Sequence, residues 1–388
     1  MNLIEVNDKK TINSFYELPY SIYKNDDNWT PPLRMMIESL FDEQKNNSLK
    51  NGHACRWILF EKGRAIGRIA AFVVPNYASS FEQVTGGIGF FECIDEQDAA
   101  DVLFDMAIAW LKTFGAEAVD GPVNIGENFF NWGLLVDGFM PQSFGMPYNK
   151  PYYRKLFENY GFLTYYEQYS YHLNITSPDL PERFWKIAAR VANKSGYSYE
   201  RFRFKQMDKY IADFINIYQQ AWAKHDNYKK IDQEEIRTML HESKLMIDED
   251  FIWFVYHDDE PVAFFMMVPD LNLLFKHFKN GKLNIFSILK MIYLKRRKVI
   301  NRCRVLVMGV TPHFQKSGIE SAIFYRLRSV LLEKKWYNEM ELGWVGDFNP
   351  KMISIFEAVG GQKAKTHITF RYLFDRRKEF KRAMPILD

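Results

Sequence analysis

The chain has 388 residues, 47% of them hydrophobic, and a formal net charge of +3. This length is about twice that of a usual domain, so the chain can bury one large core or two ordinary ones. The small net charge excludes a protein that binds polyanions over its whole surface. No apolar run of about 18 residues predicts a membrane span, and the polar segment 1–10 predicts no signal peptide. Three widely spaced cysteines, Cys55, Cys93 and Cys303, show no disulfide or metal spacing, which fits a reducing cytoplasm and predicts no metal.

The first half of the chain predicts a hairpin followed by alternating strands and helices. The predicted elements are a hairpin at 56–60 and 65–72, a strand at 87–94, a helix capped by Asp95, a strand ending at 118–122, and a helix at 152–160 closed by Gly161. The helix after Asp95 carries its apolar residues on one stripe, which indicates one buried face.

The second half predicts the same succession after two helices. Those helices are expected at 209–224 and 232–247, then a hairpin at 251–256 and 261–267, a strand at 305–310, a helix after Gly318, a strand at 339–345, a helix at 349–361 and a strand at 366–374. The two hairpins lie about 197 residues apart, which indicates an internal repeat.

The loop between the strand at 305–310 and the next helix has the pattern Gln315-x-x-Gly318-x-Glu320. The first backbone N–H groups of a helix lack internal partners, and the helix dipole adds roughly half a positive charge there. An anion such as a pyrophosphate is therefore favoured at this point, with Lys316 at its rim.

This loop and the order of the predicted elements over 205–375 resemble the GNAT superfamily of acyl-coenzyme A N-acyltransferases. The resemblance implies that the loop and its helix bind the coenzyme, and it implies three carbonyl-polarising backbone amides in the preceding strand. The coenzyme-binding residues would be Met308, Gly309, Val310, Gln315, Lys316, Ser317, Gly318, Ile319, Glu320, Ser321 and Asn349. Glu320 departs from the pattern, which has a small residue at this position. The acidic turn 93–98 in the first half predicts that this half does not bind coenzyme A as the second half does.

Acyl transfer to an amine requires a group that accepts the amine proton and one that stabilises the leaving thiolate. Glu341, Asp347 and His313 are the candidate bases, because they lie beside the predicted coenzyme loop or on the neighbouring strand. The family often donates to the thiolate from a tyrosine whose position here is Phe356, so Tyr325 is the substitute candidate.

Segments rich in Asn, Tyr and Trp are candidates for binding the acceptor. We expect Asn128, Tyr148, Asn149 and Trp344 to contact the substrate, because such side chains can hydrogen-bond and stack. The alternative is that these loops only satisfy their own backbone.

A basic insert at 271–301 separates the second hairpin from the next strand. Residues 271–319 contain eleven Lys and Arg and no Asp or Glu, with apolar residues interleaved at helical spacing. This pattern over 271–304 is typical of a segment on an anionic membrane surface. The alternative is that its apolar side packs on the chain itself. Nucleic-acid binding is not predicted, because the charge is local.

The sequence predicts an α+β fold of two tandem GNAT-like domains, each a mixed and mostly antiparallel sheet flanked by helices. The first domain would span 1–175 and lack the coenzyme loop, and the second would span 176–388 and carry it together with the insert. The predicted function is transfer of an acyl group from acetyl-coenzyme A or a longer acyl-coenzyme A to a small or long-chain amine. The alternative is a catalytically silent tandem fold that acts as a binding or membrane-surface module. The predicted location is the cytoplasm, or peripherally the inner face of the membrane.

Overall fold

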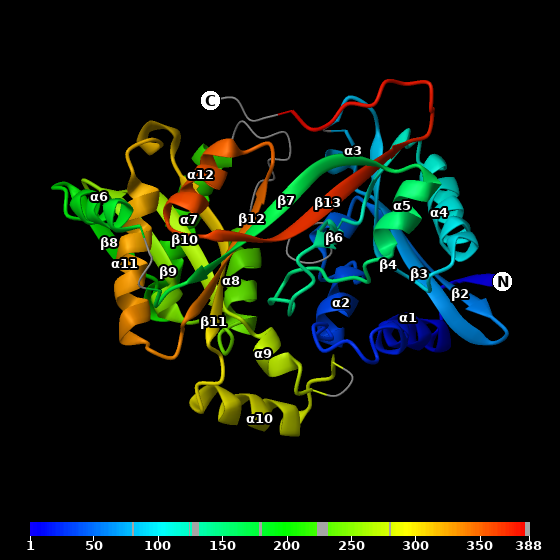
Figure 1. Ribbon diagram of the computed structural model, residues 1–388, viewed down its shortest axis with the longest axis horizontal. Coiled ribbons are helices and arrows are strands. Elements are labelled where there is room, and N and C mark those ends of the chain that lie inside the picture. The colour runs from blue at the N-terminus through cyan, green and yellow to red at the C-terminus, as the bar shows by residue number, and fades with distance from the viewer. Residues whose placement is uncertain are drawn as a thin grey trace.

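The computed structural model describes residues 1–79, 81–123, 125, 132–177, 181–222, 232–278 and 281–384. The described strands form one sheet with the order β1-β2-β3-β4-β5-β13-β7-β12-β11-β10-β9-β8, and β6 pairs with β13 beside this path. Helices cover both faces of this mixed sheet (Figure 1). The predicted α+β class is confirmed.

The strands are β1 (Asn2–Glu5), β2 (His53–Glu61), β3 (Arg64–Val73), β4 (Thr85–Cys93), β5 (Ala118–Gly121), β6 (Leu134–Asp137), β7 (Leu163–Asn174), β8 (Tyr197–Arg201), β9 (Ile252–His257), β10 (Glu260–Pro269), β11 (Arg302–Val310), β12 (Glu339–Gly346) and β13 (Gln362–Leu373). The α-helices are α1 (Lys9–Ile22), α2 (Arg34–Leu40), α3 (Pro75–Ala78), α4 (Gln97–Lys112), α5 (Tyr153–Tyr160), α6 (Glu182–Ala192), α7 (Met207–Trp222), α8 (Gln233–Glu242), α9 (Asn272–Phe275), α10 (Ile285–Arg296), α11 (Ile319–Glu333) and α12 (Pro350–Ala358).

The two halves of the sheet repeat each other about its centre. From each outer edge inward, three antiparallel pairings are followed by one parallel pairing, β4 with β5 and β11 with β12. The centre is the antiparallel pair β7 and β13. Because the central pair is antiparallel, β4 and β11 run in opposite directions and their carboxyl ends lie at opposite edges of the sheet.

The last strand of each half lies in the other half's part of the sheet. Strand β13, at the end of the chain, pairs with β5, while β7 pairs with β12. Figure 1 shows β7 and β13 side by side across the middle of the molecule. The predicted domain boundary at residue 175 falls directly after β7. It divides the chain into two similar successions of strands and helices, but these do not form two independent sheets.

A buried ion pair fastens β13 to the first half. Arg371 on β13 donates to Asp120 on β5 through two hydrogen bonds of 2.6 and 2.8 Å, and both side chains are buried. A bidentate geometry of this kind fixes the register as well as the charge balance.

Alternating residues of the strands serve the two faces of the sheet, as the period of two requires. In the first half, α1 packs on the side that carries Ile58 and Phe90, and α4 and α5 pack on the side that carries Leu59. In the second half, α7 and α8 cover Phe254 and α11 covers Val255. The predicted hairpins, strands and helices are all present, with ends that differ by a few residues. The predicted cap of α4 is wrong, because the N-cap residue is Glu96 and not Asp95.

Removing the carboxylate of Asp120 will destabilise the fold strongly. Asp120→Asn leaves the Arg371 guanidinium buried without its counter-charge, and we expect the free energy of unfolding to fall by about 3 kcal/mol. Glu117→Gln is the control, because the Glu117–Lys378 pair is half-exposed and should contribute less than about 1 kcal/mol. Urea denaturation measures both values, and equal losses in the two variants would contradict the role of the β5–β13 pair.

Candidate functional site

The parallel strands β11 and β12 separate after three residue pairs, and we call the region between their unpaired residues, Val305–Val310 and Leu342–Gly346, the cleft. The two strands are paired through Arg302–Glu339, Cys303–Met340 and Arg304–Glu341, whereas β11 continues to Val310 and β12 to Gly346. Strand β11 keeps its other partner, β10, as far as Val310, with a register shift between Met266 and Met267 that leaves Leu306 of β11 as the extra residue. The predicted Met308, Gly309 and Val310 therefore lie on the part of β11 that has separated from β12.

The end of β11 leads into the predicted anion-binding loop. Gly318 is the N-cap residue of α11 and has a φ of +82°, which glycine adopts without the steric cost met by other residues. No side chain of the described residues caps the first turn of α11. The N–H groups of Ile319, Glu320 and Ser321 thus keep the donor capacity that favours an anion.

The loop itself is less open than its sequence predicts. The backbone N–H groups of Gln315 and Ser317 donate to carbonyl groups within the loop, those of Thr311, Pro312 and Phe314. These two amides are therefore engaged within the loop and are not directed to an anion. The Gln315 side-chain amide donates to the carbonyl of Val310 at 3.3 Å, and the Ser317 hydroxyl donates to that of Phe314 at 2.5 Å.

The two remaining side chains of the loop motif differ in exposure. Lys316 is exposed and has a φ of +68°. The Glu320 residue is buried, with 6% of its surface exposed, in the first turn of α11. A carboxylate here repels a bound phosphate. We therefore still expect Glu320, which departs from the motif, to weaken the affinity for coenzyme A.

Glu341 lies at the base of the cleft in a buried polar cluster. Its carboxylate accepts two hydrogen bonds from Lys365 on β13, at 2.7 and 2.8 Å, and one from the Ser143 hydroxyl. Burial raises the pKa of the Glu341 carboxyl, but Lys365 and Ser143 outweigh burial, so this pKa lies below its ordinary value. A carboxylate held in this way is a poor proton acceptor, and we therefore do not retain Glu341 as the general base.

The segment around Ser143 also contacts β11. Arg304, which is buried, donates to the carbonyl of Phe144 at 2.5 Å. Asp270 accepts from Arg302 at 2.6 Å and from the backbone N–H of Phe144 at 2.8 Å. The segment 142–144 is thus bound to both strands at the point where they separate.

His367 on β13 lies in the same buried layer. Its ring packs on Trp132 with centroids 4.8 Å apart, and Trp132 packs in turn on the predicted Trp344 at 5.4 Å. His367 Nε2 lies 3.3 Å from the carbonyl oxygen of Pro147. Burial lowers the pKa of His367 to about 3, so its imidazole is neutral.

The other predicted catalytic residues are not gathered around Glu341. Asp347 follows β12, six residues beyond Glu341, and pairs with Arg382; six residues of strand span about 20 Å. Burial raises the pKa of its carboxyl. His313 is exposed in the short 3-10 turn Pro312–Phe314, and Tyr325 lies half-buried on α11.

The predicted substrate and coenzyme asparagines have structural contacts. Asn149 is buried, and its amide bonds to the backbone of Leu135 in both directions and to the carbonyl of Lys150. Asn349 is the N-cap of α12 and accepts from the N–H of Met352 at 3.1 Å. Neither amide is directed to a ligand by these contacts, so we no longer assign them to binding. Asn128 lies outside the described residues.

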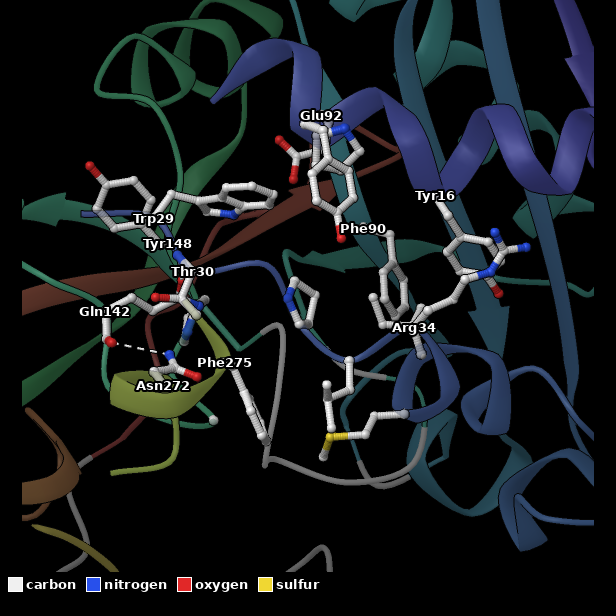
Figure 2. Close-up of a pocket in the computed structure, with 18 of the residues that line it drawn as sticks. Tyr16, Trp29, Thr30, Arg34, Phe90, Glu92, Gln142, Tyr148, Asn272 and Phe275 are labelled. Atoms are coloured by element: carbon white, nitrogen blue, oxygen red, sulfur yellow. Dashed lines mark hydrogen bonds between the residues drawn. The ribbon is translucent and has the colours of Figure 1, made fainter. Parts of the chain in front are cut away.

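A cavity of about 230 Å³ lies beside the cleft, between the first half and the insert. It is lined by α1 and α2 with the turn between them, by β3 and β4, by the segment 142–148, and by α9. Figure 2 shows Gln142 and Asn272 at one side of it, Arg34 and Tyr16 at the other, and Phe90 and Phe275 between them. The predicted Tyr148 lines this cavity and donates to Asp26 at 3.0 Å.

The cavity contains a buried carboxylate that the sequence analysis missed. Glu92 on β4 accepts hydrogen bonds from Tyr23 at 2.8 Å and Tyr153 at 2.7 Å, and Arg68 on β3 donates to it at 3.4 Å. Burial raises the pKa of Glu92 although Arg68 opposes this change. The available signal was a charged residue in the interior of each of two largely apolar strands, and these residues, Arg68 and Glu92, are directly paired in the ladder.

The cavity and the cleft share the segment 142–144 as a wall. Ser143 donates to Glu341 at the cleft base, while the flanking Gln142 and Phe144 line the cavity. The carbonyl of Gln142 accepts from Asn272 at 3.0 Å, which joins this wall to α9 (Figure 2). The anion-binding loop is at the far end of β11, about 26 Å from Arg302 along the strand.

No group of three or more His, Cys, Asp and Glu among the described residues could hold a metal ion. No described helix is both long and apolar enough to cross a bilayer.

The diverging parallel strands, the loop before α11 and the repeated halves define the tandem form of the GNAT fold. A tandem GNAT protein from the clavulanic acid biosynthesis pathway superposes with a TM-score of 0.56 at 10% identity, over 96% of this chain and 98% of that chain. A glucosamine N-acetyltransferase region of a fungal β-N-acetylglucosaminidase superposes with a TM-score of 0.58 at 13% identity, over 96% of this chain and 38% of the other. No family model matches the sequence.

Two relatives match nearly the whole sequence. Protein YghO of Escherichia coli is 26% identical over 369 residues, which is 92% of each chain. A bacterial ceramide synthase of Caulobacter vibrioides is 26% identical over 375 residues, 95% of this chain and 96% of the relative. The predicted resemblance to tandem GNAT proteins is confirmed for the fold over nearly the whole chain.

His367 will make the stability of the fold depend on pH. The folded pKa of about 3 lies below the ordinary 6.5, so between these values the unfolded chain binds a proton that the folded chain does not. Stability from this group is full above pH 6.5 and declines as the pH falls toward 3, by up to about 1.4 kcal/mol per pH unit. Urea denaturation of the wild type and His367→Gln at several pH values measures the difference. If both show the same slope, His367 is not held neutral.

Proposed function

We propose that the chain transfers an acyl group from acyl-coenzyme A to an amine, with the coenzyme in the cleft between β11 and β12. The observation that carries this proposal is the divergence of the two strands after Arg304–Glu341, directly before an uncapped helix N-terminus. Along the cleft, the edges of β11 and β12 that face each other are not paired with one another. At its far end, the first turn of α11 can bind an anion.

The residues at the two ends of the cleft suit the two ends of an acyl-coenzyme A. The diphosphate would lie against the first N–H groups of α11, from Ile319 to Ser321. Among the described residues other than its chain neighbours, only Val191 lies within 4 Å of the position that a Cβ of Gly318 would take. The thioester would lie toward the cleft base. Backbone N–H groups of β11 between Val305 and Val310 that face β12 can donate to its carbonyl oxygen.

The transfer joins the amine nitrogen to the thioester carbonyl carbon and breaks the carbon–sulfur bond. The amine loses one proton, and the coenzyme leaves as a thiol that gains one, so charge and protons balance. The contribution of this chain is to orient the two substrates and to stabilise the carbonyl oxygen as it becomes negative. Asp347 lies about 20 Å from Glu341 along β12, and His313 lies beside the anion-binding loop, so neither contacts an amine at the cleft base. We therefore assign the amine proton to a chain of water molecules, and Tyr325 remains the candidate donor to the thiolate.

The cavity behind the segment 142–144 is the proposed site of the acceptor. Its wall combines Phe90, Phe275 and Ile37 with the polar groups of Gln142 and Asn272 on the side nearest the cleft. A long-chain amine fits this division, because its chain can contact the apolar wall while its head faces the cleft. The ceramide synthase relative supports an acceptor of this kind.

The unpaired cysteines Cys55, Cys93 and Cys303 are compatible with the cytoplasm.

Two residues support the alternative of a catalytically silent fold. Glu320 brings a carboxylate to the anion-binding turn, and the buried Phe356 packs on Tyr171 with centroids 5.6 Å apart, where the family often has a hydroxyl donor. Measurement of coenzyme binding distinguishes the two functions.

Gly318→Asp will weaken coenzyme binding. The substitution adds a negative charge at the N-terminus of α11 and a side chain at a φ of +82°, so we expect the Kd of acyl-coenzyme A to rise at least tenfold, about 1.4 kcal/mol. Gly115→Asp is the matched control, because Gly115 has a φ of +75° and no described residue other than its chain neighbours lies within 4 Å of its Cβ position. Isothermal titration with acetyl- and palmitoyl-coenzyme A gives both values. No binding to the wild type at millimolar concentration would favour the silent fold.

Reducing the cavity will impair the use of long-chain amines. Ile37→Trp places a larger side chain on the cavity wall, so we expect the KM for a long-chain amine to rise about tenfold, or 1.4 kcal/mol, with the KM for acyl-coenzyme A unchanged. Ile187→Trp, at an exposed position on α6, is the control. A steady-state assay of free thiol release measures both constants. Equal KM values for the amine in the two variants would place the acceptor elsewhere.

A further inference from the structure

The insert between β10 and β11 presents an apolar surface to solvent. Helix α10 exposes Ile285, Phe286, Leu289 and Tyr293 by 62%, 77%, 56% and 60%. Successive helical residues are about 100° apart, so these four side chains lie on one stripe about 100° wide. Large contiguous apolar stripes of this kind mark an interaction site.

The opposite side of α10 explains why the stripe faces outward. Met291 is the buried residue of this helix, and Leu294 packs against the core cluster that contains α9. The sequence predicted one apolar side and left open whether it packs on the chain. The structure shows apolar side chains on both sides, one packed and one exposed. Figure 1 places α10 below α9, at the periphery of the molecule.

Basic side chains surround the exposed stripe. The exposed cations of the described insert are Lys276, Lys282, Lys290, Lys295, Arg296, Arg297 and Lys298. The stretch from residue 271 to 301 contains no Asp or Glu. By the same rotation of about 100° per residue, Arg296 falls within the stripe and Lys290 beside it. An apolar stripe among cations is complementary to the anionic headgroups and acyl chains of a bilayer surface.

We propose that the surface of α10 formed by Ile285, Phe286, Leu289, Tyr293 and the surrounding cations docks on an anionic lipid bilayer. Docking there would bring the cavity to the membrane, because Lys282 lines the cavity and Gly281 lies against Pro32 and Tyr20 at its rim. This inference concerns lipid binding and is independent of the proposed acyl transfer.

Co-sedimentation of the full chain with vesicles tests the docking. Vesicles of phosphatidylcholine with phosphatidylglycerol should bind at least tenfold more tightly than phosphatidylcholine alone, and 0.5 M salt should reduce this difference because it screens the charges. Phe286→Ser/Leu289→Ser and Lys290→Glu/Arg296→Glu should each weaken binding at least tenfold, with unchanged melting temperature, because the substituted residues are exposed.

Matched substitutions elsewhere are the controls. Ile187→Ser/Leu332→Ser and Lys155→Glu/Lys186→Glu change exposed residues of the same kinds on α5, α6 and α11 and should leave binding unchanged. Equal binding to both kinds of vesicle, or equal losses in the insert and control variants, would overturn the proposal. Concentration-dependent self-association that only the insert variants abolish, without vesicle binding, would assign the surface to a second copy of the chain.

Discussion

The ion pair between Glu341 and Lys365 holds three parts of the molecule at one point. Glu341 ends the paired section of β11 and β12, Lys365 belongs to the exchanged strand β13, and the Ser143 hydroxyl brings the segment 142–144 to the same carboxylate. Because both charged groups are buried, loss of either one leaves the other desolvated without its counter-charge. The cleft, the central strands and the cavity wall therefore depend on one contact. The Glu341 carboxylate, which the sequence analysis assigned to catalysis, thus has a structural role.

Much of the fold could be predicted because its signals are local. The hairpins, the helix after Gly318 and the Pro350–Gly360 segment follow from hydrophobic period, turn residues and caps, which act over a few residues. The positive φ of Gly318 was not predicted, although glycine is the residue that adopts this conformation most readily. The exchange of β7 and β13 could not be predicted in this way, because pairing between distant strands leaves no local pattern. The same limit applies to Asp120 and Arg371, which are 251 residues apart.

The candidate site was predicted less completely than the fold. Single residues were chosen for their chemistry, yet Asn149 and Asn349 turned out to satisfy backbone groups. The Glu92 cluster was missed because its members come from α1, β3, β4 and the start of α5, and only the tertiary structure brings them together. The cavity gives the first half a role beside the cleft, on the opposite side of the segment 142–144 from Glu341.

The most direct test of the account is a structure of the chain with a non-hydrolysable acyl-coenzyme A. The account predicts the diphosphate at the first turn of α11, with the acyl carbonyl between β11 and β12 near the last pair, Arg304–Glu341. A diphosphate bound at the start of α4, or a coenzyme that lies outside the cleft, would contradict it. Density for the acyl carbonyl beside β11 would establish that the divergence of the two strands is what makes this fold an acyltransferase.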